Sequence, residues 1–145
     1  MSLHQLIYLS KASRALTSVD FLEILEVAKR NNASLGVTGS LFYNGGWFLQ
    51  VLEGDVTVIN SLYRRIEQDE RHQQSQVIFL EPASCRVFSR WTMNMINLEK
   101  ERDSKYDILV DVIKAATRGG LVEGLSPAVK LLKVFSSDHL FHSAC

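Results

Sequence analysis

A tight turn at residues 44–46 constrains the fold more than any other feature of this 145-residue chain. Asn44-Gly45-Gly46 supplies residues that adopt positive φ values at little cost, as the shortest β-hairpin loops require. The segments on either side, residues 36–43 and 47–54, are rich in β-forming residues and are predicted to be strands. The chain is therefore expected to contain an antiparallel strand pair near the middle of its sequence.

One residue of the second strand in this pair is chemically out of place. Gln50 has the same parity as Phe48 and Leu52, so its primary amide is expected to lie on a buried face. Burying an amide without hydrogen-bond partners costs about 1–3 kcal/mol. Because that cost has to be offset, we expect a polar ligand to be held against this face of the sheet.

Helix signals lie on both sides of the strand pair. Thr17-Ser18-Val19-Asp20 has the spacing of a capping box and predicts a helix that ends near Asn31-Asn32. Asp55 predicts the start of a second helix, which runs to about Glu70. Further strands are predicted at residues 3–9, 76–80 and 91–96. The order β-α-β-β-α-β-β predicts an α+β sandwich of ferredoxin-like type, with two helices on one face of a mixed sheet.

The segment after residue 98 differs in character from the rest of the chain. Tyr106, Leu109, Val112 and Ile113 have helical spacing and predict an amphipathic helix that ends before Gly119-Gly120. Ser126-Pro127 predicts the start of another helix. We expect a domain of residues 1–98 and a helical extension of residues 99–145, whose two helices cover the sheet face left open by the first two.

Charge and hydropathy bear on the partners that the chain can have. Lys+Arg and Asp+Glu both number 16, so the formal net charge of zero gives no support for nucleic acid or a membrane surface as partner. A near-neutral protein associates readily with itself, which favours a homo-oligomer. No signal peptide or bilayer-crossing apolar run is visible, so we expect a cytoplasmic protein.

The sequence lacks the motifs of the common catalytic sites. No Gly-rich phosphate loop follows a strand, no serine lies on a nucleophile elbow, and no His or Asp pattern supports a catalytic thiol at Cys85. His139, His142 and Cys145 have helical spacing, but a frayed terminus explains them better than a metal site does. We therefore predict neither an enzyme nor a metal-binding protein.

The remaining polar candidates lie on the predicted sheet and its helices. Tyr8 has the parity of Leu6, so its phenol meets the amide of Gln50 if the two strands are neighbours. Asn31-Asn32 lies where the second helix is expected to pack, and Arg65 lies beside the apolar stripe of that helix. Each has an ordinary reading by itself, as a packing pair, a helix cap or a solvated arginine. Together they offer amides and a cation to a planar heterocycle.

Five motifs, in order and at fitting spacing, resemble the BLUF domain, the blue-light sensor that uses flavin. They are Leu6–Ala12, Arg30–Asn32 with Gly36–Leu41, Phe48–Gly54, Asp69–His72 and Arg90–Met93. The resemblance covers about residues 3–98. It departs from the family at Val37, where Ile is usual, and at Thr92, where Ser is usual. The length is most similar to the short, stand-alone members.

The resemblance implies a non-covalent flavin between the two helices, FAD with FMN as the alternative. The positions that match flavin-binding residues of the family are Asn31, Asn32, Gln50, Arg65 and His72. Asn32 would bind the C4 carbonyl and N3 edge of the ring, and Asn31 and Arg65 would reach the C2 carbonyl side. Gln50 would lie between the phenol of the first strand and the N5 and O4 edge, with His72 near the far end of the ring.

The resemblance also implies a photochemical relay. Light drives electron and proton transfer from Tyr8 to the flavin, and Gln50 relays the proton and returns in a changed tautomer or orientation, which shifts the absorption slightly to the red. Trp91 and Met93 are expected to carry the signal, because a two-residue strand slip exchanges them without turning the face over. As no output domain is visible, we expect the signal to reach another copy of the chain or a separate downstream signalling protein.

Two other functions stay open on the sequence. A flavin-dependent oxidoreductase would need a substrate face over the ring and a catalytic acid or base. A ferredoxin-like binding module that has lost its flavin would need none of Tyr8, Asn32 and Gln50, all of which are present. The colour of the purified protein separates the binding module from the other two functions, and substrate-dependent flavin reduction would identify the oxidoreductase.

Overall fold

The structure is a computed structural model, and it describes residues 2–88, 92–101 and 103–117. Within this part of the chain a five-stranded sheet has the strand order β4-β1-β3-β2-β5. The strands are β1 (Leu3–Ala12), β2 (Thr38–Asn44), β3 (Trp47–Asp55), β4 (His72–Pro82) and β5 (Met95–Asn97). The helices are α1 (Ser18–Leu35), α2 (Val56–Glu67) and α3 (Asp107–Thr117), with 3-10 turns at Leu98–Lys100 and Ser104–Tyr106.

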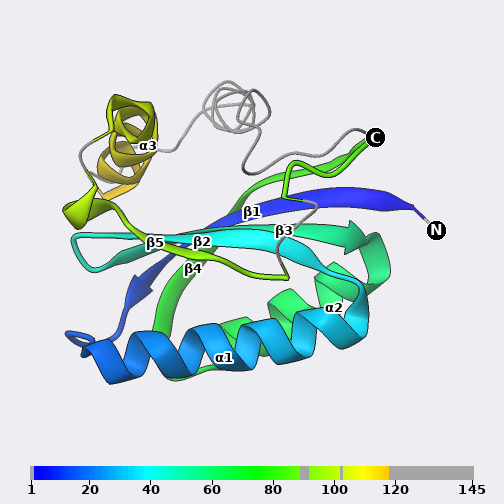
Figure 1. The fold of residues 1–145 in the computed structure, drawn as a ribbon, viewed down its shortest axis with the longest axis horizontal. Helices are drawn as coiled ribbons and strands as arrows, with labels where there is room; N and C mark the ends of the chain where they lie inside the picture. The colour runs from blue at the N-terminus through cyan, green and yellow to red at the C-terminus, as the bar shows by residue number, and fades with distance from the viewer. Residues whose placement is uncertain (1, 89–91, 102, 118–145) are drawn as a thin grey trace.

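The sheet is mixed and has helices on both faces. β1 pairs antiparallel with β3 and β4, β2 pairs antiparallel with β3, and β5 pairs parallel with β2. Helices α1 and α2 lie on one face and α3 lies on the other (Figure 1). The predicted order of elements and the α+β class are confirmed. No helix in the described residues is both long and apolar enough to span a bilayer.

The first helix starts where the sequence predicts and ends later. Thr17 and Asp20 form the capping box in both directions. The predicted end at Asn31-Asn32 is wrong, because α1 continues to Leu35 and Gly36 closes it in the left-handed conformation at φ 68°. Glycine reaches that conformation at no steric cost, so it serves as the stop signal in place of asparagine. Both asparagines therefore lie within the last turns of α1.

The hairpin and the second helix follow from local chemistry. Gly45 and Gly46 have φ values of 57° and 83° and form the two-residue loop between β2 and β3, as primed turns require. Asp55 caps α2 by accepting a hydrogen bond from the amide of Thr57. Helix α2 ends at Glu67, three residues before the predicted end, because a turn at residues 69–72 leads directly into β4.

The last strand differs from its prediction. Residues 91–96 were expected to form it, whereas β5 is confined to Met95–Asn97, the segment that pairs with β2. Met93 precedes the strand, and Trp91 lies outside the described residues. Parity arguments along a strand therefore do not apply to Met93.

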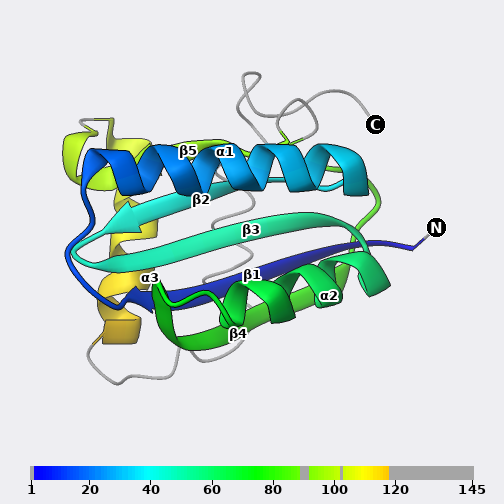
Figure 2. The ribbon, with the colours of Figure 1, turned by 90° about the horizontal axis from the view of Figure 1, so that it is seen from below.

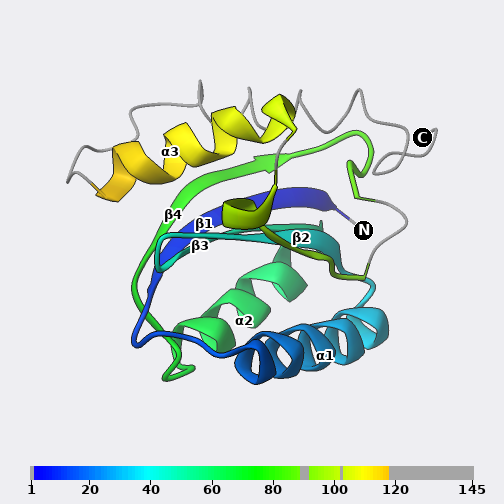
Figure 3. The same ribbon diagram turned by 60° about the vertical axis from the view of Figure 1, so that its left-hand side comes forward.

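Strand alternation divides the core into two layers. Leu6, Tyr8 and Leu52 face α1 and α2, whereas Ile7 and Val51 face the opposite side. On that opposite side the predicted apolar stripe of the extension is buried: Tyr106, Leu109, Val112 and Ile113. Figure 3 shows α3 lying over the sheet, across from α1 and α2. The expectation that a C-terminal helix covers the open face is confirmed for α3, and the helix predicted from Ser126 lies outside the described residues.

Candidate functional site

A cavity of about 540 Å3, counting the part open to solvent, lies between α1, α2 and the sheet. Figure 2 shows the two helices side by side across this face of the sheet, with β3 between them in projection. The apolar walls of the cavity are Ile24, Val27, Ala28, Leu41, Leu62 and Ile66. Its polar lining is Tyr8, Asn31, Asn32, Gln50, Asp69, Arg71 and His72. Two apolar helix walls with amides at the floor suit a flat ring that has a polar edge.

Three buried side chains form a row that reaches the floor of the cavity through Tyr8 and Gln50. Tyr8 and Gln50 are directly opposite each other in the β1–β3 register. The hydroxyl of Tyr8 donates a hydrogen bond to Oε1 of Gln50, and Nε2 of Gln50 lies 3.5 Å from the sulfur of Met93. The exposed fractions of Tyr8, Gln50 and Met93 are 0%, 4% and 2%, so the row is shielded from bulk solvent. The predicted meeting of phenol and amide is confirmed.

The surroundings hold Tyr8 in its neutral form. Burial raises the pKa of the phenol far above its ordinary value, and the neighbouring Tyr63 and Asp69 raise it further. A proton that leaves this buried hydroxyl has to pass to its acceptor, the amide oxygen of Gln50. The geometry therefore couples any change at Tyr8 to the orientation or protonation of Gln50.

Asn32 joins the cavity to the segment before β5. It lines the cavity and is buried in the last turns of α1, and its Nδ2 donates to the backbone oxygen of Thr92 at 2.7 Å. The next residue is Met93, which touches Gln50. Two cavity residues on different elements therefore bind consecutive residues of one segment. Asn31 lines the same cavity and is half-buried.

His72 begins β4 at one end of the cavity. Its Nδ1 is 2.8 Å from the hydroxyl of Ser10, and its ring packs 4.9 Å from the ring of Phe48, centroid to centroid. Burial lowers the pKa of His72 below its ordinary value, while the carboxylate of Asp69 acts in the opposite direction. The neutral imidazole is therefore favoured near pH 7.

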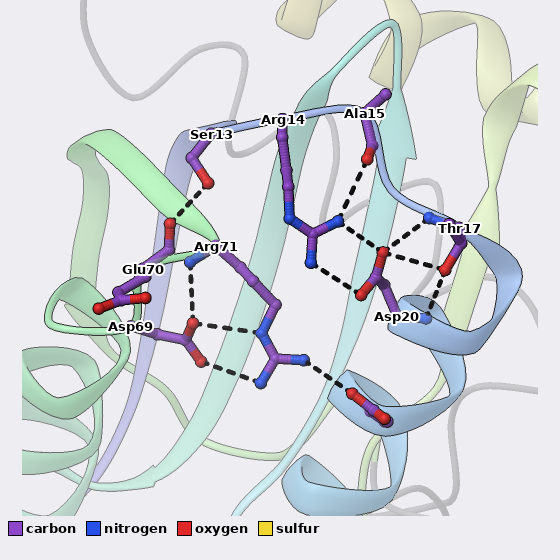
Figure 4. Close-up of polar contacts among 9 residues, drawn as sticks. Ser13, Arg14, Ala15, Thr17, Asp20, Asp69, Glu70 and Arg71 are labelled. Atoms are coloured by element: carbon purple, nitrogen blue, oxygen red, sulfur yellow. Dashed lines mark hydrogen bonds and ion pairs between the residues drawn. The ribbon is translucent and has the colours of Figure 1, made fainter.

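The cation of the cavity is Arg71. Arg65, by contrast, is exposed in the last turn of α2 and is not among the lining residues, so the structure does not bring it together with the other candidates. Arg71 Nε lies 3.3 Å from Oδ1 of Asp69, and its NH1 lies 3.8 Å from Oε2 of Glu23 on α1 (Figure 4). No role for Arg71 was predicted from the sequence, although its place next to His72 could have indicated one.

Hydrogen bonds from the loop between β1 and α1 hold the start of α1 and the turn before β4 together at the end of the cavity where Arg71 lies. The guanidinium of Arg14 makes two hydrogen bonds to Asp20, at 2.8 and 3.0 Å, and Thr17 donates to the same carboxylate (Figure 4). The hydrogen bonds from Arg14 lower the pKa of Asp20 well below its usual range. The hydroxyl of Ser13 donates to the backbone oxygen of Glu70. These bonds join the start of α1 to the turn that carries Arg71.

One protein family matches this sequence over a region that contains every lining residue of the cavity. The model of the BLUF family, described as sensors of blue-light using FAD, matches residues 3–94. Photoactivated adenylate cyclase subunit beta of Euglena gracilis is 38% identical over 93 residues, which are 63% of this chain and 11% of that protein. Subunit alpha of the same organism is 34% identical over 108 residues, 74% of this chain and 10% of that protein. The chain thus spans about a tenth of the length of these relatives.

Solved structures give the same fold. BlrB, described as a BLUF protein in its dark state, matches with a TM-score of 0.77 and 27% identity, covering 94% of this chain and 96% of that one. A bacterial light-regulated adenylyl cyclase matches with a TM-score of 0.73 and 30% identity, covering 81% and 34%. The photo-activated state of BlsA, at 21% identity and a TM-score of 0.77, shows the fold alone.

Proposed function

Since the chain belongs to the BLUF family of blue-light sensors that use FAD, we propose that Tyr8, Gln50 and Met93 form its light-responsive row. The chain is a flavin-binding blue-light photoreceptor, and these three residues are proposed to carry its response to light. The observation that carries it is the Tyr8–Gln50–Met93 contact at the floor of the cavity.

The residues of the cavity fit a flavin. The apolar side chains of α1 and α2 provide two walls for a flat aromatic ring. The amides of Asn31, Asn32 and Gln50 provide donors and acceptors for its carbonyl and imide edge. Two cations are candidates for the C2 carbonyl side: Arg71, which lines the cavity, and Arg65, which was predicted from the sequence and lies exposed in the last turn of α2. FAD is the expected cofactor, and it supplies the light absorption and the electron acceptor.

The chain's own part of the reaction is a hydrogen-bond exchange. Tyr8 gives up an electron and passes its proton to Gln50, its direct hydrogen-bond partner. When the electron and the proton have both returned to Tyr8, the amide of Gln50 is left in a changed orientation or tautomer. Because the oxygen and nitrogen of an amide have opposite hydrogen-bond polarity, one rearrangement changes the contact with Tyr8 and the contact with Met93 together.

The signal leaves through protein contacts in this proposal. Met93 is the residue through which Gln50 acts on the segment before β5, and Trp91 is the second signalling candidate of that segment. The light-sensing part is proposed to end near residue 98, with the helices after it as the output. The sensing domain itself catalyses no reaction in this view, and its partner is another copy or a separate effector protein. Light-regulated adenylyl cyclases are among its relatives, which makes a cyclase-type effector one candidate class.

Absorption spectroscopy tests the proposal. The protein is purified in darkness, its visible spectrum is recorded, and the record is repeated after blue light. A small red shift that reverts in the dark is expected. Tyr8→Phe and Gln50→Leu should each keep the yellow colour and lose the shift, because the phenol or the relaying amide is gone. Tyr63→Phe is the matched control, since Tyr63 packs 5.1 Å from the ring of Tyr8 and hydrogen-bonds Ser75.

The competing functions give different spectra. Bleaching under light would indicate flavin reduction and support the oxidoreductase. A colourless protein that takes up no added FAD would exclude both flavin-dependent functions and support the ferredoxin-like binding module. A red shift of normal size in Tyr8→Phe would refute the assignment of the row.

A further inference from the structure

We propose that Glu53 is a positioning residue for the light signal. Its buried carboxylate holds residues 86–88 against the sheet, and this attachment sets where Met93, later in the chain, meets Gln50. The inference rests on the proposed function, because it concerns how Met93 is presented to the light-responsive amide. Glu53 is on β3, like Gln50, but it faces the opposite side of the sheet.

The carboxylate of Glu53 is fully buried and accepts four hydrogen bonds. Oε2 accepts from Nε2 of Gln5 at 2.9 Å and from the amide of Val87 at 2.6 Å. Oε1 accepts from the hydroxyl of Thr38 at 3.1 Å and from the amide of Phe88 at 2.8 Å. Gln5 and Thr38 are the cross-strand neighbours of Glu53 on β1 and β2, so one side chain joins three strands to one loop segment.

Arg86 extends the same attachment. Its NH1 donates to the hydroxyl of Thr38 at 2.9 Å and to the backbone oxygen of Glu53 at 3.1 Å. Its NH2 donates to the backbone oxygen of Gly36 at 2.8 Å. Phe88 is fully buried in the core layer on the α3 side. Residues 86–88 are thus held by side-chain bonds and by burial, although they belong to no helix or strand.

The segment that follows is attached on the other side of the sheet. Thr92 accepts a hydrogen bond from Asn32, Met93 touches Gln50, and Asn94 accepts a hydrogen bond from the amide of Leu41. Residues 86–88 and 92–94 are therefore two neighbouring attachments, one on Glu53 and one on the cavity. A rearranged Gln50 acts on residues 92–94. Because the bonds to Glu53 keep residues 86–88 fixed to the sheet, residues 92–94 then move relative to the sheet.

The chemistry of the site requires a carboxylate. All four partners are donors, and two of them are backbone amides that cannot rotate to become acceptors. An ionised carboxylate accepts all four, whereas an amide of the same size presents N–H groups to at least one donor. Packing alone would be served by a side chain of the same volume, so the choice of an acid points to the attachment of Val87 and Phe88.

Hydrogen exchange of backbone amides, in darkness and under blue light, tests the proposal on the flavin-loaded protein. In the natural chain, the amides of Val87 and Phe88 should exchange at the same rate in both conditions, while amides of residues 92–97 exchange faster in light. In Glu53→Gln the red shift should persist. Exchange at Val87 and Phe88 should become roughly tenfold faster or more in both conditions, and the light-induced difference over residues 92–97 should be lost.

Gln5→Leu is the matched control. It removes one donor from the same carboxylate, keeps a similar volume, and leaves the bonds to Val87 and Phe88. It should retain the light-induced difference over residues 92–97, which separates the attachment from a general effect of disturbing the core.

Two results would overturn the inference. One is a full light-induced difference over residues 92–97 in Glu53→Gln. The other needs no variant: in the natural chain, amides 87 and 88 would speed up in light as much as those of 92–97. The second measurement decides the matter if Glu53→Gln fails to fold. A natural chain that takes up FAD and shows no red shift would instead contradict the proposed function, and the dark comparison of Glu53→Gln with Gln5→Leu would still test the attachment.

Discussion

The hydrogen bond between Tyr8 and Gln50 can be measured as a coupling free energy. Tyr8→Phe removes the donor and leaves the amide oxygen of Gln50 without its partner in a buried site. Gln50→Leu removes the acceptor and leaves a fully buried hydroxyl. Each single change should destabilise the protein by about 1–3 kcal/mol, the cost of an unsatisfied buried polar group.

The double variant should cost less than the sum of the two. In Tyr8→Phe with Gln50→Leu neither polar group of the pair remains, and replacing both partners by apolar groups of similar shape is nearly neutral. We therefore expect a coupling free energy of at least about 1 kcal/mol, within the range found for residues in direct contact.

Urea unfolding of the flavin-free protein, followed by circular dichroism, provides the four free energies. Flavin is left out because a bound ligand adds its own stabilisation to the folded state. Equal m-values in the four proteins are required for the comparison. Additive costs, with a coupling below about 0.3 kcal/mol, would refute the reasoning and mean that the Tyr8–Gln50 bond contributes nothing to the folded state.

Three further predictions follow from single sites. Gly39→Ala should lower stability by about 2–4 kcal/mol, measured by thermal unfolding, since its Cβ would lie 2.0 Å from the backbone oxygen of Val51; an unchanged melting temperature would contradict it. The pKa of Asp20 is lowered, chiefly because Arg14 donates hydrogen bonds to it, so its contribution to stability is complete above about pH 4 and is lost as pH falls toward the lowered pKa. Asp20→Asn should remove this part of the acid dependence of unfolding. An acid unfolding curve of the same shape in the variant would contradict the prediction. Burial lowers the pKa of His72, so the unfolded chain takes up a proton near pH 6.5 before the folded chain does, and stability should fall as pH decreases below that value. His72→Gln should flatten the pH dependence of unfolding between about pH 7 and 5. An equally steep dependence in this variant would exclude His72 as its source.

Much of the fold could be predicted because its signals are local. The Gly45-Gly46 turn requires positive φ, and the capping box at Thr17 needs only three residues of spacing. Parity on two strands was enough to place Tyr8 and Gln50 on one face, once the strands were assumed to be neighbours. The end of α1 was misplaced because Asn and Gly both tolerate the left-handed conformation, and only the structure shows that Gly36, whose amide donates to the backbone oxygen of Asn32, is the one used.

The sequence by itself determined the elements, their order and the pair that faces the cavity, because turns, caps and alternation depend on residues within a few positions of one another. The tertiary structure decided what lies far apart along the chain. It placed Met93 beside Gln50 from outside the strand, brought Arg71 into the lining of the cavity, and gathered four donors around Glu53. Such contacts depend on the crossing of separate elements in three dimensions, and spacing along the chain carries no measure of that distance.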